Sequence, residues 1–85
     1  VRMKRVLLTT AHILRKVGIP RHKLHYLEKK GYITPHRVPM GNVELRLFGS
    51  EDLEKITLLW KYLKEGFNDQ TAYQKTMKDL ERGKR

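Results

Sequence analysis

The sequence predicts a mainly α-helical fold with a small β-hairpin, in which four helices accompany two strands. Three observations predict it: apolar residues recur at helical spacing in four segments, proline and glycine interrupt that spacing between residues 34 and 48, and charged and apolar residues alternate inside the interruption. A chain of 85 residues is long enough for one domain with a small core. We expect a basic lead-in over residues 1–8, the domain over 9–80 and a frayed basic tail over 81–85.

The first two helices are expected to lie close together along the chain. Thr9 or Thr10 can cap a first helix whose apolar residues share one face, and this helix ends at Gly18. A second helix begins at Pro20, which suits a first helical turn, and ends at Gly31, which can take the left-handed conformation. The few residues between the helices leave room only for a tight turn, so the outline is a helix-turn-helix.

The second helix has two different faces, and the rest of the chain is organised around it. Leu24, Leu27 and the stem of Lys30 follow an i, i+3 spacing that points toward a core. The other sides carry hydrogen-bond donors and a flat aromatic ring, from Arg21, His22, His25, Tyr26 and Lys29. A short helix with a basic exposed side suits a DNA groove. The same charges also fit a solvated surface, and Tyr26 also fits a place at the edge of the core with its hydroxyl in water.

Residues 32–48 are expected to fold as a hairpin, with its turn at residues 40–42. Val43, Leu45 and Leu47 alternate with charged residues, which is the pattern of a strand with one buried face. A hairpin that follows a helix-turn-helix is called a wing. The prediction is therefore a winged helix-turn-helix with four helices and a two-stranded wing.

The last two helices are expected to supply the centre of the core. Ser50, followed by two carboxylates, predicts the start of a third helix with the serine hydroxyl as its cap. Asn68 is the expected cap of the fourth helix. The apolar residues of the third helix recur at three- and four-residue intervals: Leu53, Ile56, Leu59, Trp60 and Leu63.

Charge and composition bound the function. Nineteen Lys and Arg residues against nine Asp and Glu residues give a formal net charge of +10, which favours nucleic acid as a partner, with an anionic membrane surface as the alternative. The absence of cysteine excludes disulfides and thiolate metal sites and suits a reducing compartment. The apolar runs are too short for a transmembrane span or a signal-peptide core. We expect a cytoplasmic protein associated with the nucleoid.

Three motifs resemble those of the MerR family. The run LHYLEKKGYITPHR (residues 24–37) resembles that family's stretch of leucine, arginine, two tyrosines and glutamate, followed by glycine, proline and arginine at fixed spacings. FGSEDLEKI (48–56) resembles the family's strand end and third helix, and KEGF (64–67) its glycine-containing corner. The resemblance covers Thr9 to about Leu80. It implies a winged helix-turn-helix whose second helix enters the major groove of duplex DNA while the wing lies on the flanking backbone.

The resemblance also implies roles for single residues. Tyr26 corresponds to a tyrosine of the family's second helix and Arg37 to an arginine of its wing, both of which touch the DNA backbone. Arg46 corresponds to the arginine of the family's glycine-tyrosine-arginine wing motif. Base reading is expected from the start of the second helix, at Arg21, His22, Lys23 and His25, with Lys29 also on the DNA-binding surface.

Three departures from the family pattern are visible. His25 stands where the family has arginine, the wing is longer between its glycine and its arginine, and the long dimerisation helix that follows the fourth helix is not in these 85 residues. Activators of the family need two linked copies, so we expect either the DNA-binding part of a longer regulator or a protein that pairs weakly or acts beside a partner protein.

Other functions are less well supported. His22 and His25 lie at i, i+3 spacing but lack a third ligand, so no metal is expected, and no cofactor motif or catalytic constellation is present. Two alternatives to a transcriptional regulator stay open. One is an excisionase-like accessory protein that reads DNA shape beside a recombinase, and the other is an adaptor that binds another protein through its wing and fourth helix.

Overall fold

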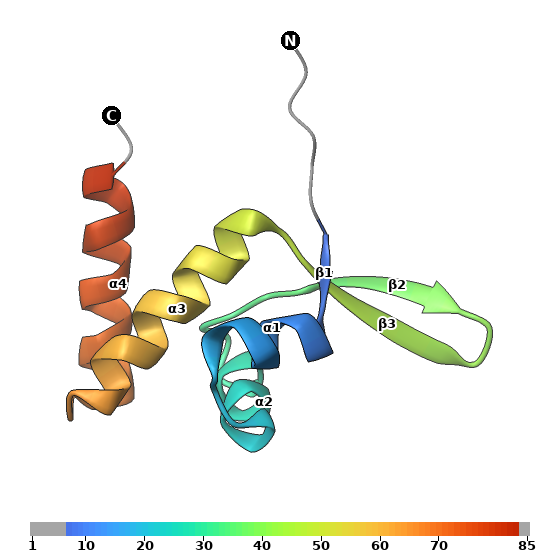
Figure 1. Ribbon diagram of the computed structural model, residues 1–85, viewed down its shortest axis with the longest axis horizontal. Coiled ribbons are helices and arrows are strands. Elements are labelled where there is room, and N and C mark those ends of the chain that lie inside the picture. Colours follow the sequence, from blue (N-terminus) through green and yellow to red (C-terminus); the bar gives the residue numbers. More distant parts are fainter. Residues whose placement is uncertain (1–6, 84–85) are drawn as a thin grey trace, which may run out of the picture.

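The computed structural model describes residues 7–83, and the expectations for residues 1–6 and 84–85 lie outside this range. Residues 81–83, expected in the frayed tail, instead belong to the last helix, which continues to Gly83. The elements follow the chain as β1 (Leu8–Thr9), α1 (Thr10–Val17), α2 (Arg21–Lys29), β2 (His36–Met40), β3 (Val43–Phe48), α3 (Ser50–Lys64) and α4 (Asp69–Gly83). The α1–α2 pair lies below the sheet in Figure 1, the β2–β3 hairpin extends to one side, and α3 and α4 lie on the other. The predicted mainly helical fold with four helices is confirmed.

The ends of the first two helices follow from local chemistry. Thr9 precedes α1, and its hydroxyl accepts a hydrogen bond from the backbone N–H of His12 at 3.3 Å. Pro20 precedes α2 with φ −64°, which is already close to the helical value. Gly31 follows the cap of α2 with φ +86°, a conformation that a side chain would strain. The boundaries of the helix-turn-helix are therefore within one residue of the prediction: Pro20, expected in the first turn of α2, is its extended N-cap with ψ 147°, and Lys30, expected to turn its stem toward the core, caps the other end and is exposed.

The wing has three strands rather than the two that the sequence predicts. The sheet order is β1-β3-β2 with both pairs antiparallel, and Leu8 of β1 lies opposite Phe48 of β3. Leu8 thus belongs to the sheet and to the core, although it was expected in the lead-in. A strand of two residues is too short to show an alternating pattern, and its pairing partner is far away in the sequence, so the prediction missed it.

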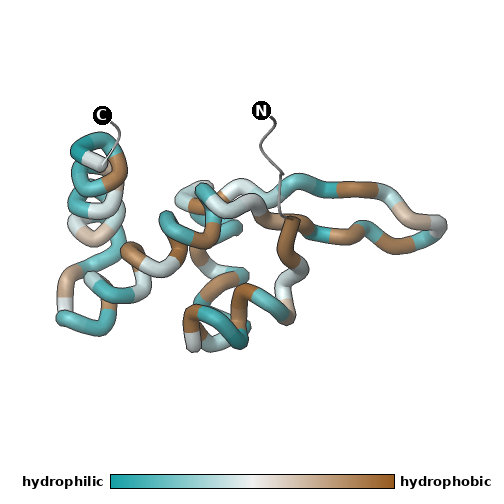
Figure 2. The backbone as a smooth tube through the Cα atoms, turned by 45° about the horizontal axis from the view of Figure 1, so that its top comes forward, coloured by the Kyte–Doolittle hydropathy of each residue, from teal (hydrophilic) through white to brown (hydrophobic). Residues whose placement is uncertain are grey.

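The apolar face of the wing is exposed, so the prediction that this face is buried is wrong. Met40 pairs with Val43 and Val38 with Leu45, which places these four side chains on one face of the hairpin. Val43 is 67% exposed and Met40 is 54% exposed. Figure 2 shows hydrophobic positions interspersed along both strands out to the tip. The reason is geometric: Val43 and Leu45 lie on the strand face opposite to buried Phe48 and so point away from the core, and the hairpin also projects beyond the helices (Figure 1).

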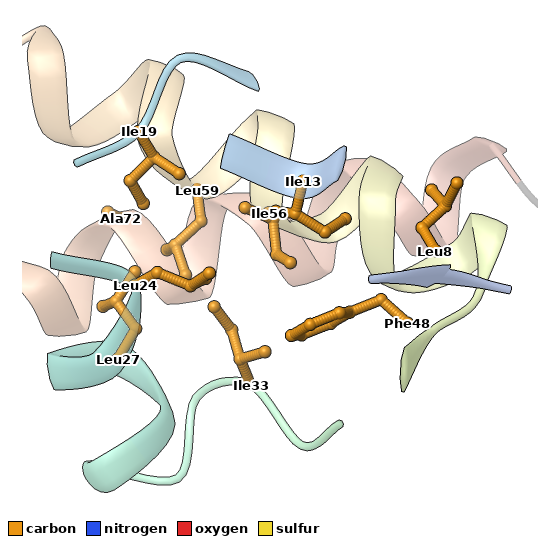
Figure 3. Packing of buried hydrophobic residues seen from close by; sticks show 10 residues of the cluster. All are labelled: Leu8, Ile13, Ile19, Leu24, Leu27, Ile33, Phe48, Ile56, Leu59 and Ala72. Atoms are coloured by element: carbon orange, nitrogen blue, oxygen red, sulfur yellow. The ribbon is translucent and has the colours of Figure 1, made fainter. Parts of the chain in front are cut away.

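The core lies where α1, α2 and α3 meet the base of the sheet. Ile56 and Leu59 of α3 are fully buried, and Leu24 and Leu27 of α2 pack into the same cluster, as predicted. Figure 3 shows the side chains of α2 and α3 converging on Ile33 and Phe48. The full cluster is Leu8, Ile13, Ile19, Leu24, Leu27, Ile33, Phe48, Ile56, Leu59 and Ala72, with Leu53, Trp60 and Leu63 partly buried against it.

The caps of the last two helices differ from each other. Ser50 is the first residue of α3 rather than its cap, because Gly49 occupies the cap position and Asp52 Oδ2 accepts the Gly49 N–H at 3.0 Å. Asn68 is a cap as predicted, since its Oδ1 accepts the N–H of Thr71 at 2.8 Å. In residues 7–83, no helix is both long and apolar enough to cross a bilayer.

Candidate nucleic-acid interface

The exposed face of α2 carries most of the side chains that the sequence predicts to contact DNA. Buried Leu24 and Leu27 fix which side of this helix faces the core. The opposite sides then reach solvent: Arg21, His22, His25, Tyr26 and Lys29 are exposed, and Lys23 is half-buried. The structure therefore brings the predicted residues of α2 together on one accessible surface.

Tyr26 lies at the centre of a small cationic cluster on this face. The ammonium nitrogens of Lys23 and Lys30 lie 5.0 Å and 5.6 Å from the centre of its ring, within the range of cation–π attraction. Hydrogen bonding to the Asp69 carboxylate, followed by desolvation, raises the pKa of the Tyr26 phenol above its ordinary value. At neutral pH the phenol is thus a neutral hydrogen-bond donor, 39% exposed and outside the core cluster.

Asp69 comes from the first turn of α4 and connects that helix to α2. Its carboxylate lies 3.9 Å from Lys23 Nζ, and it is the first cause of the raised Tyr26 pKa. The contact is loose and partly solvated, so its contribution to stability is small. Its consequence is positional, because it limits where the side chains of Lys23 and Tyr26 can point.

Arg46 of β3 also reaches α2. Its Nε lies 3.1 Å from Glu28 Oε1, and the Glu28 side chain is only 6% exposed. This contact is an ion pair and not an aligned hydrogen bond, since Arg46 Nε has no hydrogen-bond partner despite this distance, and the other carboxylate oxygen, Glu28 Oε2, is buried without a partner as well. Arg46, a predicted member of the DNA-binding set, therefore directs its Nε at the protein itself.

Arg37 of β2 lies beside Arg46 on the same face of the wing, because the two residues are opposite each other in the strand register. Arg37 Nη1 lies 3.2 Å from Glu44 Oε1, and both side chains are about half exposed. An exposed pair of this kind exchanges readily with water and with other anions. Arg37 is thus available to an external phosphate at little cost.

Two acidic residues of this surface were missed by the sequence reasoning. Glu28 is the only acid in α2, and Asp69 begins α4; each approaches a cationic residue of another element. A lone carboxylate in a strongly basic helix was the available signal for Glu28. Nothing in the sequence pointed to Asp69, because its contacts depend on how α4 packs.

Among residues 7–83, no group of three or more His, Asp or Glu side chains is placed to hold a metal ion, and His22 and His25 acquire no further ligand.

Two helices joined by a tight turn, followed by an antiparallel hairpin and a basic exposed helix face, define a winged helix-turn-helix, a class of DNA-binding protein. The family model for MerR HTH family regulatory proteins matches residues 8–77 of this chain. The chain therefore belongs to the MerR HTH family, whose members are DNA-binding transcription regulators. None of the curated proteins compared with the chain matches it.

Proposed function

We propose that this chain is a sequence-specific DNA-binding module of a transcription regulator, with α2 in the major groove and the wing on the flanking backbone. One observation carries the proposal: the exposed face of α2 gathers cations and an aromatic ring on the side opposite to its two buried leucines. A helix with such a face can enter the major groove, where base edges present distinct patterns of donors and acceptors. The formal net charge of +10 attracts the chain to any DNA regardless of its base sequence, so sequence preference must come from the contacts of α2.

The residues divide into two roles. Arg21, His22, Lys23 and His25 lie in the first half of α2 and read base edges, since recognition helices contact bases through their first turns. Tyr26, Lys29, Arg37 and Arg46 contact phosphates or orient the residues that do. The partner is double-stranded DNA in the cytoplasm, at the nucleoid, and neither a cofactor nor catalysis enters the mechanism. Pairing with a second copy or with another protein would lengthen the site that is read.

Selection from a random pool of duplexes tests the proposal directly. The 85-residue chain should enrich a defined sequence and bind it roughly a thousandfold more tightly than a scrambled duplex at physiological salt. R21A should relax the preference at one base pair by about 1–3 kcal/mol. K78A, a variant in an exposed part of α4, is the control and should leave the preference unchanged. Equal binding to all sequences would remove the sequence-specific part of the proposal.

A second candidate function is an accessory protein that acts beside another protein on DNA, as excisionase-like domains do. The exposed apolar face of the wing favours it. Single exposed apolar side chains are ordinary on a protein surface, but four that pair across one hairpin form a patch that suits contact with another protein. These side chains alternate with Arg46, which points toward α2, so they face away from that helix. Under this candidate, V43S combined with L45S leaves binding to an isolated duplex unchanged. Loss of that binding would instead assign the apolar face to DNA.

A further inference from the structure

The wing and the recognition helix must keep a fixed relation if both are to contact one duplex. Strands β2 and β3 pack mainly against each other, and β3 also packs against β1, α1 and α3, rather than against α2. Figure 1 shows the hairpin projecting away from the helices. In the part of the chain that the structure describes, the pair between Glu28 and Arg46 is the only ion pair that joins α2 to the sheet.

The side chain of Glu28 is buried, and its one ion-pair contact in residues 7–83 is with Arg46. Its side chain is 6% exposed, so it cannot be an ordinary solvated charge of the helix surface. Its Oε2 is buried without a hydrogen-bond partner, which means that the carboxylate is desolvated more than it is satisfied. An ion pair with one buried partner contributes little net stability, but it restricts the arrangements that the two elements can adopt, because moving Arg46 away leaves the buried Glu28 carboxylate uncompensated.

The pair between Glu28 and Arg46 is the inner end of a row of charged side chains that continues along the wing. Arg46 lies opposite Arg37 in the register, and Glu44 is on the same strand face two residues away from Arg46. Glu28, Arg46, Arg37 and Glu44 thus form a row of charges that starts inside the recognition helix and continues along one face of the hairpin. Glu28 is the one buried side chain of this row, so the inner pair is the contact whose separation is costly, and it adds a direct link from the wing to α2 to the packing of β3 on β1, α1 and α3.

We propose that Glu28 is a positioning residue for DNA recognition, which fixes the wing against α2 through Arg46 so that both elements engage the duplex as one unit. This inference rests on the proposed function, since it concerns how that same surface is assembled. Glu28 itself does not contact DNA. Arg46 contributes to binding chiefly through Glu28, and Arg37 is the wing residue whose position depends on the pair.

A pair of matched variants tests the inference. E28Q and E44Q each remove one carboxylate of the same charge row, so each raises the net charge equally, and each keeps the shape of the side chain. General electrostatics predicts that both bind DNA slightly more tightly, because a negative charge is lost. The inference predicts opposite outcomes: E44Q binds as tightly as the wild type or more so, whereas E28Q binds roughly tenfold more weakly.

A DNA footprint shows which contacts are lost, those of α2 or those of the wing, which a change in overall affinity does not show. In E28Q, hydroxyl-radical protection of the deoxyriboses should persist at the nucleotides under α2 and disappear from those under the wing. The slope of log affinity against log salt should also become shallower by about one for each phosphate contact that the wing loses. Tighter binding by both variants, or an unchanged footprint in E28Q, would overturn the inference.

A double-mutant cycle tests whether Arg46 acts through Glu28. If it does, R46Q and the E28Q/R46Q double variant should bind equally weakly, because either change breaks the same link. If Arg46 contacts a phosphate independently, the two losses add, and the inference is contradicted.

A measurement without DNA keeps the inference testable if E28Q folds poorly or if the wild type fails to bind. The chain has no cysteine, so a spin label on N42C at the wing tip is unique. Its paramagnetic effect on the α2 amides should differ between the wild type and R46Q, and should be the same in the wild type and E44Q. Equal effects in the wild type and R46Q would contradict the inference. Failure of the wild type to bind any duplex would instead refute the proposed function.

Discussion

Replacing Lys29 with alanine is the sharpest single perturbation of the proposed DNA surface. Lys29 of α2 and Lys30, the residue that caps it, are exposed and have no ion-pair partner among residues 7–83. Arg37 of the wing has only an exposed pair, so these three cations are the ones most available to phosphates. Each phosphate that a cation neutralises contributes about −0.9 to the slope of log affinity against log salt, so three contribute about −2.7. Between about 50 and 200 mM salt, this slope corresponds to a loss in affinity of about fortyfold.

K29A should reduce the magnitude of that slope to about 1.8 and the loss over the same salt range to about twelvefold. Alanine is a good helix former, so α2 should stay intact. The measurement is fluorescence anisotropy of a labelled duplex, titrated with protein at several salt concentrations. K78A is the matched control, since it removes the same charge from an exposed part of α4 about 13 Å along that helix from Asp69. An equal change in slope for K29A and K78A would show that the protein attracts DNA through its overall charge and not through α2.

Three further predictions concern the fold that presents this surface. L27A removes a fully buried side chain of α2 and should lower the free energy of unfolding in urea by about 3 kcal/mol, whereas L45A, on the exposed wing face, should cost less than about 1 kcal/mol. G31A meets no atom within 4 Å but must adopt φ +86°, so it should cost about 1–2 kcal/mol through backbone strain alone; a loss near zero would show that the chain rearranges there. Tyr62 donates a hydrogen bond to Asp79, which raises the pKa of the phenol above its ordinary value of 10.0. The difference in unfolding free energy between the wild type and Y62F should therefore be constant as the pH approaches 10 from neutrality and should decline above pH 10. A difference that persists at higher pH would contradict this.

Features with a local cause were predictable from the sequence. The boundaries of α2 follow from Pro20 and Gly31, two residues whose backbone preferences do not depend on the rest of the fold. The buried positions of Leu27 and Ile56 follow from helical spacing, which marks one face of each helix. The Asn68 cap follows from a single side chain and the N–H three residues later. In each case the decisive interactions lie within a few residues of one another.

Features that depend on distant contacts were not predictable. The β1 strand is recognisable only through its pairing with Phe48, and the role of Glu28 only through its contact with Arg46. The wing shows the limit of pattern reading most clearly. Alternation correctly placed Val43 and Leu45 on one strand face, but whether that face is covered depends on which face of the hairpin is turned toward the helices and on how far the hairpin projects.

The central claim is that the exposed side of α2 and the wing together form the surface that lies against duplex DNA. The most direct test is a titration of the isotope-labelled 85-residue chain with its selected duplex, monitored through backbone amide chemical shifts. The account predicts that the largest shifts occur in residues 21–30 and 36–48, while the C-terminal half of α4 stays unchanged. Shifts concentrated in α4, or no shifts at all, would contradict it.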